Sequence, residues 1–374
     1  MKTDNITQSA FFALLRSGLW EKGTALPPDA PIDFSALYKL AEEQSVTGLV
    51  AAGLQLSHYS GMPEDIASKL ADEVRHMSVR NRMMNYFISV IVEQMRQNGI
   101  RPLLLKGQGI AQCYEKPKLR ASGDIDLLLQ GGDYEKAKKL LMPMAESVEQ
   151  EAASVKHLGL SISPWLVELH GSIRSTLSRR IDREMDAIQA CMFSGTGSRV
   201  WDTGANEVQL PSPDEDIVYV FVHILQHYYR GGIGLRQLCD WSRLVWTYRD
   251  GIDRTLLESR LKSMRLDVEW RAFAAFAVEL LGMPAEAMPL YEPKPSLKRK
   301  ADRIKSFIME VGNFGYNRDM SYYSSRPFLV RKLISFGQRV ADLCRHARTF
   351  PLGALRFFPF IVFNGLRSAA HGEG

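Results

Sequence analysis

Apolar residues recur at intervals of three and four positions over most of this chain, which is the pattern of amphipathic helices. The pattern covers about residues 6–97 and returns after residue 213. In the first region it predicts a long helix from Pro63 to Asn98, ended by a following glycine. The later helices are expected at about residues 214–229, 234–249, 253–263, 266–281, 296–312 and 327–347.

The middle segment has shorter apolar runs of the kind that form strands. Residues 100–105 and 124–129 are expected to be buried strands. Residues 165–170 alternate between apolar and polar positions, so they predict a strand with two different faces. Further segments with strand character lie near residues 147–149 and 154–161.

Together these elements predict an α+β fold with a small mixed β-sheet at its centre. The expected division is an N-terminal helical region in residues 1–99, an α/β core in residues 100–210 and a C-terminal helical domain in residues 211–374. Residues 174–206 show no clear period, and residues 316–327 read as a polar loop rich in Tyr and Ser.

Two carboxylates stand two residues apart in the second expected strand. Asp124 and Asp126 would point to the same face, because side chains at i and i+2 of a strand do so. Strand interiors normally avoid Asp, and the two charges repel each other. A divalent cation with a preference for oxygen ligands would compensate for the repulsion. The alternative is a pair of exposed acids at the start of a strand.

A turn precedes these carboxylates. Residues 106–109, with the sequence KGQG, follow the first expected strand and lead into a helix. Backbone N–H groups in such a turn attract phosphate, and Lys106 would add a positive charge. The turn is neither a Walker A loop nor a dinucleotide-binding fingerprint, because it lacks the Gly-Lys-Ser/Thr sequence and a third glycine. Alone, it is also compatible with a purely structural turn.

The composition changes this picture little. The chain is 45% hydrophobic and 24% charged, as is ordinary for a globular protein. Its net charge of +5 suits an anionic substrate such as a nucleotide, but is too small to indicate nucleic acid by itself. Four cysteines without a CxxC pair indicate reduced thiols in a cytoplasmic protein and argue against a zinc site.

No secretory signal is visible in the sequence, and we expect no stable membrane span. The apolar run at residues 357–366 is far shorter than the roughly 20 residues of a spanning helix. It would pack against the rest of the chain, or else lie on a membrane surface or in the groove of a partner.

The turn and the acidic strand together resemble a known family. The sequences LKGQ at residues 105–108 and RASGDIDL at residues 120–127 resemble the nucleotidyltransferase signature of the DNA polymerase β superfamily. Similar patterns occur in bacterial nucleotidyltransferases with a Lys-Gly turn and an Arg-x-Ser-x-Asp-x-Asp strand, among them abortive-infection type toxins. The resemblance covers about residues 100–170 directly and implies that residues 100–210 form a nucleotidyltransferase core.

The resemblance also implies roles for individual residues. Asp124 and Asp126 would bind metal and take part in catalysis. Glu168 is the best match to the third carboxylate of the superfamily, and His170 would contact phosphate or shuttle a proton. The alternative for both residues is a polar edge of a strand.

The phosphate side of the resemblance is less regular. Lys106, Gly107 and Gln108 would line the triphosphate turn, and Arg120 and Ser122 would lie near the nucleotide. A Gly-Gln pair replaces the familiar Gly-Ser, which removes a hydroxyl from the turn. The separation between the turn and the carboxylates is also longer than in many members of the superfamily.

Two residue pairs follow on the expected C-terminal helices. Arg236 and Asp240 have the i, i+4 spacing of a helix-face ion pair, or would meet phosphate and acceptor in a nucleotide cleft. His223 and His227 have the same spacing, but the Glu of an HExxH zinc site is absent. Packed or cleft-lining histidines are therefore the simpler interpretation.

The leading hypothesis is a nucleotidyltransferase that depends on Mg²⁺ or Mn²⁺. It would move a nucleoside monophosphate from an NTP to an unidentified acceptor, which is a small molecule, an RNA or a protein, and release pyrophosphate. One alternative is a catalytically silent protein that binds nucleotides or partners. Another is a toxin-type enzyme that modifies RNA by the same chemistry.

Overall fold

The computed structural model of the chain describes residues 4–27, 30–152, 156–195, 197–318 and 328–370. The first helices are α1 (Asn5–Trp20), α2 (Phe34–Glu43), α3 (Thr47–Ser57) and α4 (Glu64–Gln97). The middle of the chain contains β1 (Leu103–Leu105), α5 (Gly107–Ala111), η1 (Pro117–Leu119), β2 (Ile125–Leu128), α6 (Asp133–Leu141), η2 (Met142–Met144), β3 (Ser147–Val148), β4 (His157–Ile162), β5 (Trp165–His170), α7 (Arg179–Phe193), β6 (Arg199–Asp202) and β7 (Glu207–Leu210).

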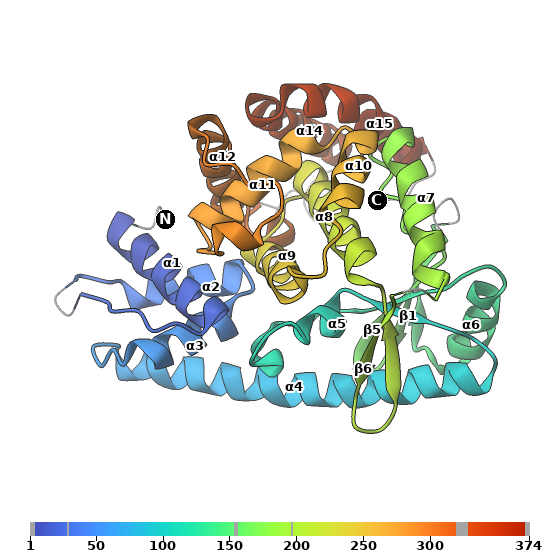
Figure 1. Ribbon diagram of the computed structural model, residues 1–374, viewed down its shortest axis with the longest axis horizontal. Coiled ribbons are helices and arrows are strands. Elements are labelled where there is room, and N and C mark those ends of the chain that lie inside the picture. The colour runs from blue at the N-terminus through green and yellow to red at the C-terminus, as the bar shows by residue number, and fades with distance from the viewer. Residues whose placement is uncertain (1–3, 28–29, 153–155, 196, 319–327, 371–374) are drawn as a thin grey trace.

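The remaining elements are helical. They are α8 (Pro213–Arg230), α9 (Leu235–Tyr248), α10 (Arg254–Met264), α11 (Asp267–Glu279), η3 (Ala285–Ala287), α12 (Pro295–Val311), η4 (Asn313–Gly315), α14 (Phe328–Thr349) and α15 (Pro351–Ala370). Helices thus flank a small region of strands on both sides in the sequence, and the predicted α+β class is confirmed (Figure 1).

The main sheet has five strands in the order β1-β2-β5-β4-β3. The β2–β5 pair is parallel and the other neighbours are antiparallel, so the sheet is mixed as predicted. The register places Asp126 of β2 directly beside Glu168 of β5. A separate hairpin is formed by β6 and β7.

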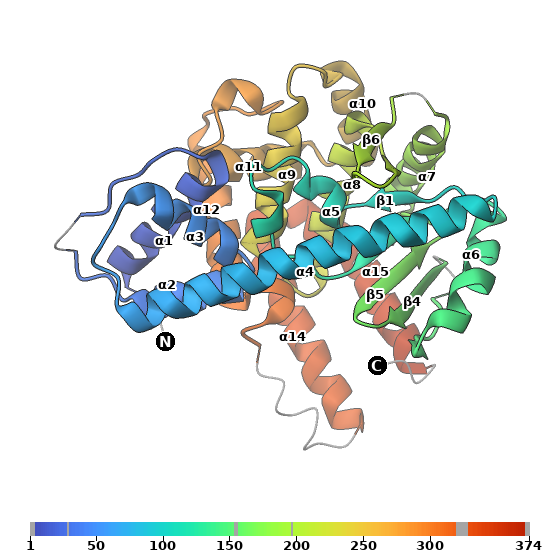
Figure 2. The same ribbon diagram turned by 90° about the horizontal axis from the view of Figure 1, so that it is seen from below.

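One face of the main sheet is covered by α4 and α6. Ile125 and Leu127 of β2 and Val167 of β5 are buried in one hydrophobic cluster with residues such as Met84 of α4 and Tyr134 of α6. The long helix α4 continues beyond the sheet and runs along the N-terminal helices as well (Figure 2). Its bounds agree closely with the helix predicted from residues 63 to 98.

The opposite face of the sheet looks toward the C-terminal helices, with α8 near the centre of the molecule (Figure 1). Phe221 of α8 packs edge-on against Trp270 of α11, with 4.9 Å between ring centroids. Phe221 and Trp270 belong to a second hydrophobic cluster, which also contains residues of the N-terminal helices. The Trp20 indole of α1 donates to the Leu281 carbonyl over 2.6 Å. The division into domains after residues 99 and 210 stays a prediction.

Two poorly patterned parts of the chain have different outcomes. Residues 174–206 contain α7, which the sequence analysis did not predict, and its N-cap Ser178 accepts from the Ile181 N–H. The polar loop expected at residues 316–327 lies largely outside the described residues.

The apolar run at residues 357–366 belongs to α15, where Phe357 packs against Tyr229 of α8 with 4.7 Å between ring centroids. In the described part of the chain, no helix has the length and apolar character needed to cross a membrane.

Candidate functional site

Three carboxylates lie close together at the β2–β5 pair, in the middle of the sheet. Asp124 immediately precedes β2, Asp126 lies within it, and Glu168 is the neighbour of Asp126 across the strands. One ligand oxygen from each residue lies within 4.8 Å of the others. Asp126 is only 2% exposed. The repulsion of Asp126, together with burial, raises the pKa of Asp124 above its usual value. Such a cluster of buried, mutually repelling oxygen ligands fits a divalent cation.

Cationic and imidazole side chains partly balance these acids. Lys106 Nζ lies 3.0 Å from Asp126 Oδ1, and His170 Nε2 lies 2.8 Å from the same oxygen. Burial opposes the charge on Lys106, but Asp126 outweighs this effect and raises the pKa of the ammonium. Burial also disfavours the charged form of His170, yet its bonds to Asp126 and Glu168 raise its pKa. Both side chains therefore favour their positive forms beside the acids.

Glu168 has a second imidazole next to it. His157 Nε2 of β4 lies 3.1 Å from Glu168 Oε2, and His170 Nε2 lies 3.3 Å from the same oxygen. Burial opposes ionisation of Glu168, but the hydrogen bonds with the two histidines hold its pKa well below the usual range. His157, Glu168 and His170 form a second group of ligand atoms within 4.8 Å of one another. Glu168 is thus shared between the carboxylate cluster and the histidine pair.

The turn before α5 brings Lys106 to the carboxylates. Lys106 has a positive φ of 49°, and Gly107 follows with φ of 39°, a region that favours glycine. A Cβ added to Gly109 would lie 2.8 Å from Leu210 Cδ2, so α5 packs closely against the Leu210 side chain of β7. The short helix α5 is therefore seated by backbone geometry, and Lys106 occupies a strained conformation of the kind found at functional sites.

A single asparagine of α4 holds the loop between the turn and the carboxylates. Asn81 Nδ2 donates to the carbonyls of Lys118 and Arg120, each over 2.8 Å. Its Oδ1 accepts from Gln108 Nε2 over 2.9 Å and from Ser122 Oγ over 2.6 Å. Gln108 and Ser122 were predicted to lie by the nucleotide, but their side chains are engaged by Asn81. A nucleotide role at these two positions stays a prediction and would rest on their backbone groups.

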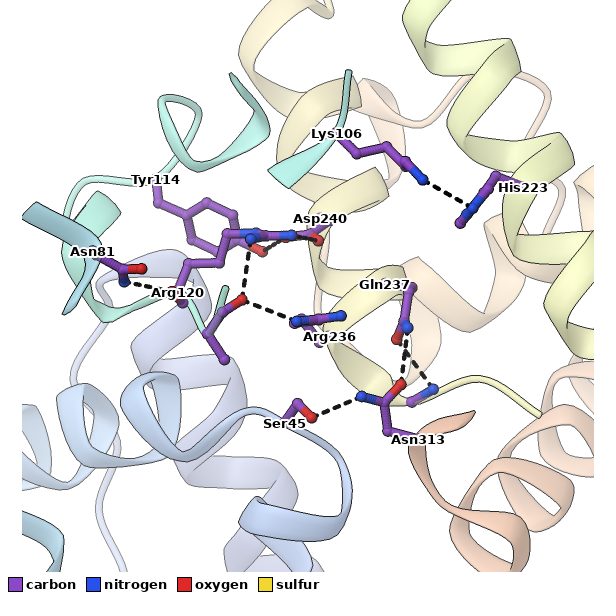
Figure 3. A network of polar contacts seen from close by, with 12 residues as sticks. Ser45, Asn81, Lys106, Tyr114, Arg120, His223, Arg236, Gln237, Asp240 and Asn313 are labelled. Carbon is purple, nitrogen blue, oxygen red and sulfur yellow. Dashed lines mark hydrogen bonds and ion pairs between the residues drawn. The ribbon is translucent and has the colours of Figure 1, made fainter. Parts of the chain in front are cut away.

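Asp240 of α9 fixes the same loop from the other side (Figure 3). Its carboxylate accepts from Arg120 Nε over 2.8 Å and from Arg120 Nη2 over 2.7 Å. Tyr114 Oη also donates to Asp240, over 2.8 Å. The ion pair between Arg236 and Asp240 suggested by their spacing is not what forms, because Arg120 saturates the carboxylate. Nucleotide binding by Arg120 and Asp240 stays a prediction.

Arg236 lies beside this buried pair. Its Nη1 donates to the Ala121 carbonyl over 3.1 Å, whereas its buried Nε has no hydrogen-bond partner among the described residues. Burial, followed by the nearby Arg120, lowers the pKa of Arg236. The nearby carboxylates of Asp240 and Asp124 act in the opposite direction but do not outweigh burial. An anionic group of a substrate would favour the charged guanidinium further.

Helix α8 covers Lys106 with two histidines. His223 Nε2 lies 3.1 Å from Lys106 Nζ and accepts its hydrogen bond, as Figure 3 shows. His227 Nε2 lies 3.2 Å from His223 Nε2. Burial and the charge of Lys106 hold the pKa of His223 well below its usual value and lower that of His227 to about 4. Both rings are therefore neutral at pH 7, and both line the cavity described next.

These groups surround one cavity of about 470 Å³. Side chains of the sheet, α8 and α9 line it, and Phe314 of η4 closes one side. The volume lies within the usual range of small-molecule sites. Of the predicted residues, the described lining comprises Lys106, Gly107, Arg120, Asp124, Asp126, Glu168, His170, Arg236 and Asp240.

Sequence reasoning missed Asn81, Tyr114, His157 and Phe314. Asn81 offered the clearest signal, because it interrupts the apolar side of a long amphipathic helix and a buried polar group needs partners. His157 lies in a predicted strand and pairs with His170 across the β4–β5 ladder. Tyr114 and Phe314 carry no local signal, since their roles depend on contacts with distant segments.

A comparison with protein-family models matches residues 30–282 to a family described as an uncharacterised nucleotidyltransferase. The comparisons with curated proteins and with solved structures give no match. The matched residues make up more than half of the chain and contain β1, β2, β5, α8 and α9, which carry most of the cavity. The chain belongs to this nucleotidyltransferase family.

Proposed function

We propose that this enzyme transfers a nucleoside monophosphate from an NTP to an acceptor hydroxyl in a metal-dependent reaction that releases pyrophosphate. Membership of the family supports nucleotidyl transfer in general. The observation that carries metal dependence is the convergence of Asp124, Asp126 and Glu168, whose ligand oxygens lie within 4.8 Å of one another. Three carboxylates gathered in a mostly buried place offer the hard oxygen ligands that a divalent cation prefers.

The three carboxylates would hold Mg²⁺ or Mn²⁺. Bound there, the metal supplies activation of the acceptor hydroxyl and neutralises charge on the phosphates. Lys106 keeps its own charge beside Asp126 and would pair with a phosphate oxygen. Arg236 would balance a second anionic group, because its Nε is buried without a partner among the described residues.

The protonation states divide the work between His170 and Glu168. His170 has a raised pKa and favours its protonated form, so it balances charge better than it accepts a proton. Glu168 has a lowered pKa and stays ionised at neutral pH, which suits a metal ligand better than a general base. We therefore assign orientation and charge balance to His170, and metal binding to Glu168.

The acceptor separates this proposal from its alternatives. A small molecule, an RNA and a protein all offer hydroxyls, and a toxin-type enzyme would use the same carboxylates on RNA. A silent nucleotide-binding protein would have no need of the third acid, so Glu168 beside Asp126 supports an active enzyme.

An acceptor screen tests the proposal. Each of the four NTPs, labelled at the α-phosphate, is incubated with the enzyme, Mn²⁺ or Mg²⁺, and the RNA, protein and metabolite fractions of a lysate. We expect label in one fraction and stoichiometric pyrophosphate, both lost in Asp124→Asn and Asp126→Asn. If no fraction is labelled and no NTP binds, the proposed function is wrong. If the variants label as well as the wild type, the metal site is wrong.

A further inference from the structure

A short loop after α12 presents Phe314 to the cavity. Phe314 is 53% exposed, and its backbone has a positive φ of 51°. That conformation is uncommon for a bulky residue and persists only where the surroundings impose it. Among the described residues that line the cavity, Tyr219 carries the other phenyl-type ring, and it is buried. Phe314 therefore offers the cavity an aromatic side chain that the fold leaves about half exposed.

The neighbouring asparagine clamps this loop to two other parts of the chain. Asn313 Oδ1 accepts from Gln237 Nε2 of α9 over 2.8 Å, and Asn313 Nδ2 donates to Ser45 Oγ over 2.7 Å. Figure 3 shows both bonds. A Cβ added to Gly234 would lie 2.7 Å from Asn313 Cβ, so the start of α9 packs tightly on the loop. The contacts of Asn313 therefore fix the position of the neighbouring Phe314.

A continuous row of contacts joins Phe314 to the carboxylates. Asp126 pairs with Lys106, Lys106 bonds to His223, and His223 lies against His227. The His227 ring then meets Phe314 with 4.9 Å between centroids and an interplanar angle of 73°. An edge-on contact of this kind leaves ring surface of Phe314 free. One wall of the cavity is therefore charged at its start and aromatic at its end.

We propose that Phe314, supported by His227, forms a stacking subsite for the planar base of the nucleotide. This inference rests on the proposed function and identifies the part of the site that would bind the base. Base–aromatic stacking tolerates any nucleobase, since every base has a π-face. Phe314 lies outside residues 30–282, which match the family. The C-terminal part of the chain would then complete the substrate site of the family core.

Binding measurements on the full-length protein with Mn²⁺ test the subsite. Calorimetry compares an NTP with inorganic tripolyphosphate, a probe that has no base. In Phe314→Leu the ring is lost while the side chain still occupies a positive φ, and Phe314→Trp keeps a stacking surface. The matched control is Tyr86→Leu on α4, because Tyr86 is 70% exposed and does not line the cavity in the described structure.

We expect Phe314→Leu to weaken NTP binding roughly ten-fold and to leave tripolyphosphate binding unchanged, whereas Phe314→Trp and Tyr86→Leu bind both as the wild type does. Equal weakening of both probes would show that the loop merely supports the site and would overturn the subsite. Unchanged NTP binding in Phe314→Leu would also overturn the proposed stacking subsite. If the wild type binds neither probe, the proposed function itself fails.

Discussion

Arg120 and Asp240 form a buried two-pronged ion pair across 120 residues of sequence. Arg120 ends the 3₁₀ turn before the acidic strand, and Asp240 lies in the middle of α9. The pair therefore joins the loop that leads to Asp124 to the helical half of the molecule. Its two residues line the cavity, but their charges already satisfy each other.

Removal of one partner should destabilise the fold more than it alters the chemistry. In Asp240→Leu the buried guanidinium of Arg120 loses its counterion, so we expect the free energy of unfolding in urea to fall by about 3 kcal/mol. The double variant Arg120→Leu/Asp240→Leu removes both charges of the pair and should recover part of this loss. Asp186→Ala, which breaks the exposed pair with Arg174, is the control and should cost less than about 1 kcal/mol. A double variant no more stable than Asp240→Leu would contradict the argument.

The carboxylate cluster should make stability depend on metal. Repulsion from Asp126 and burial raise the pKa of Asp124, so its ionised form lowers the stability of the metal-free protein at neutral pH. Asp124→Asn should therefore raise the melting temperature without metal, and should lose the further rise that Mn²⁺ gives the wild type. At a concentration 100 times its Kd, a ligand stabilises by about 2.7 kcal/mol.

Thermal melts with EDTA and with a Mn²⁺ series measure both effects. Asp250→Asn removes one acid that is 88% exposed, and it serves as the control for a change in net charge. A melting temperature that rises equally with Mn²⁺ in Asp124→Asn and in the wild type would show that the ion binds elsewhere.

Local patterns in the sequence predicted the elements whose formation depends on residues close together in the chain. The long apolar stripe defined α4 to within about a residue, because helical periodicity is carried by the helix itself. The same holds for Asp124 and Asp126, whose spacing places them on one face. Their role as metal ligands stays a prediction, although the fold adds Glu168 beside them.

The remaining features depend on contacts between distant segments. Helix α7 is an exception, because Ile181, Met185, Ile188 and Met192 recur at helical spacing and the local pattern was missed. Asn81 accepts a hydrogen bond from Ser122, 41 residues away, and no short-range sequence pattern predicts such a bond. The loop that carries Phe314 is held by contacts of Asn313 with Gln237 and with Ser45, the latter 268 residues earlier.

The contact between His223 and Lys106 predicts a difference between two substitutions. His223→Phe removes the acceptor of the Lys106 ammonium, so we expect the KM for NTP to rise roughly ten-fold, in keeping with a hydrogen bond to a charged group. His223→Gln keeps an acceptor oxygen and should retain a KM near the wild-type value. Steady-state kinetics on the acceptor found in the screen measure both, with His76→Phe on the exposed side of α4 as the control. Equal effects of the two substitutions would show that volume, not hydrogen bonding, matters at this position.

Glu269 of α11 predicts a pH dependence of stability far from the carboxylates. Burial raises its pKa to about 7 in the folded protein, against 4.5 for the ordinary group. The folded state therefore binds more protons between pH 4.5 and 7, and stability falls as the pH rises through this window, by up to about 3 kcal/mol. Glu269→Gln abolishes the titration, so urea unfolding should show the variant to be more stable than the wild type at pH 8 and little different at pH 4.5.

The Glu269 side chain lies beside Gly353 of α15, where an added Cβ would come within 2.6 Å of Glu269 Oε1. A variant shortened before residue 351 lacks α15, so it should expose the carboxylate and lose most of the pH 8 difference between Glu and Gln. A difference that survives the truncation would place the source of the raised pKa in α11 and its other neighbours.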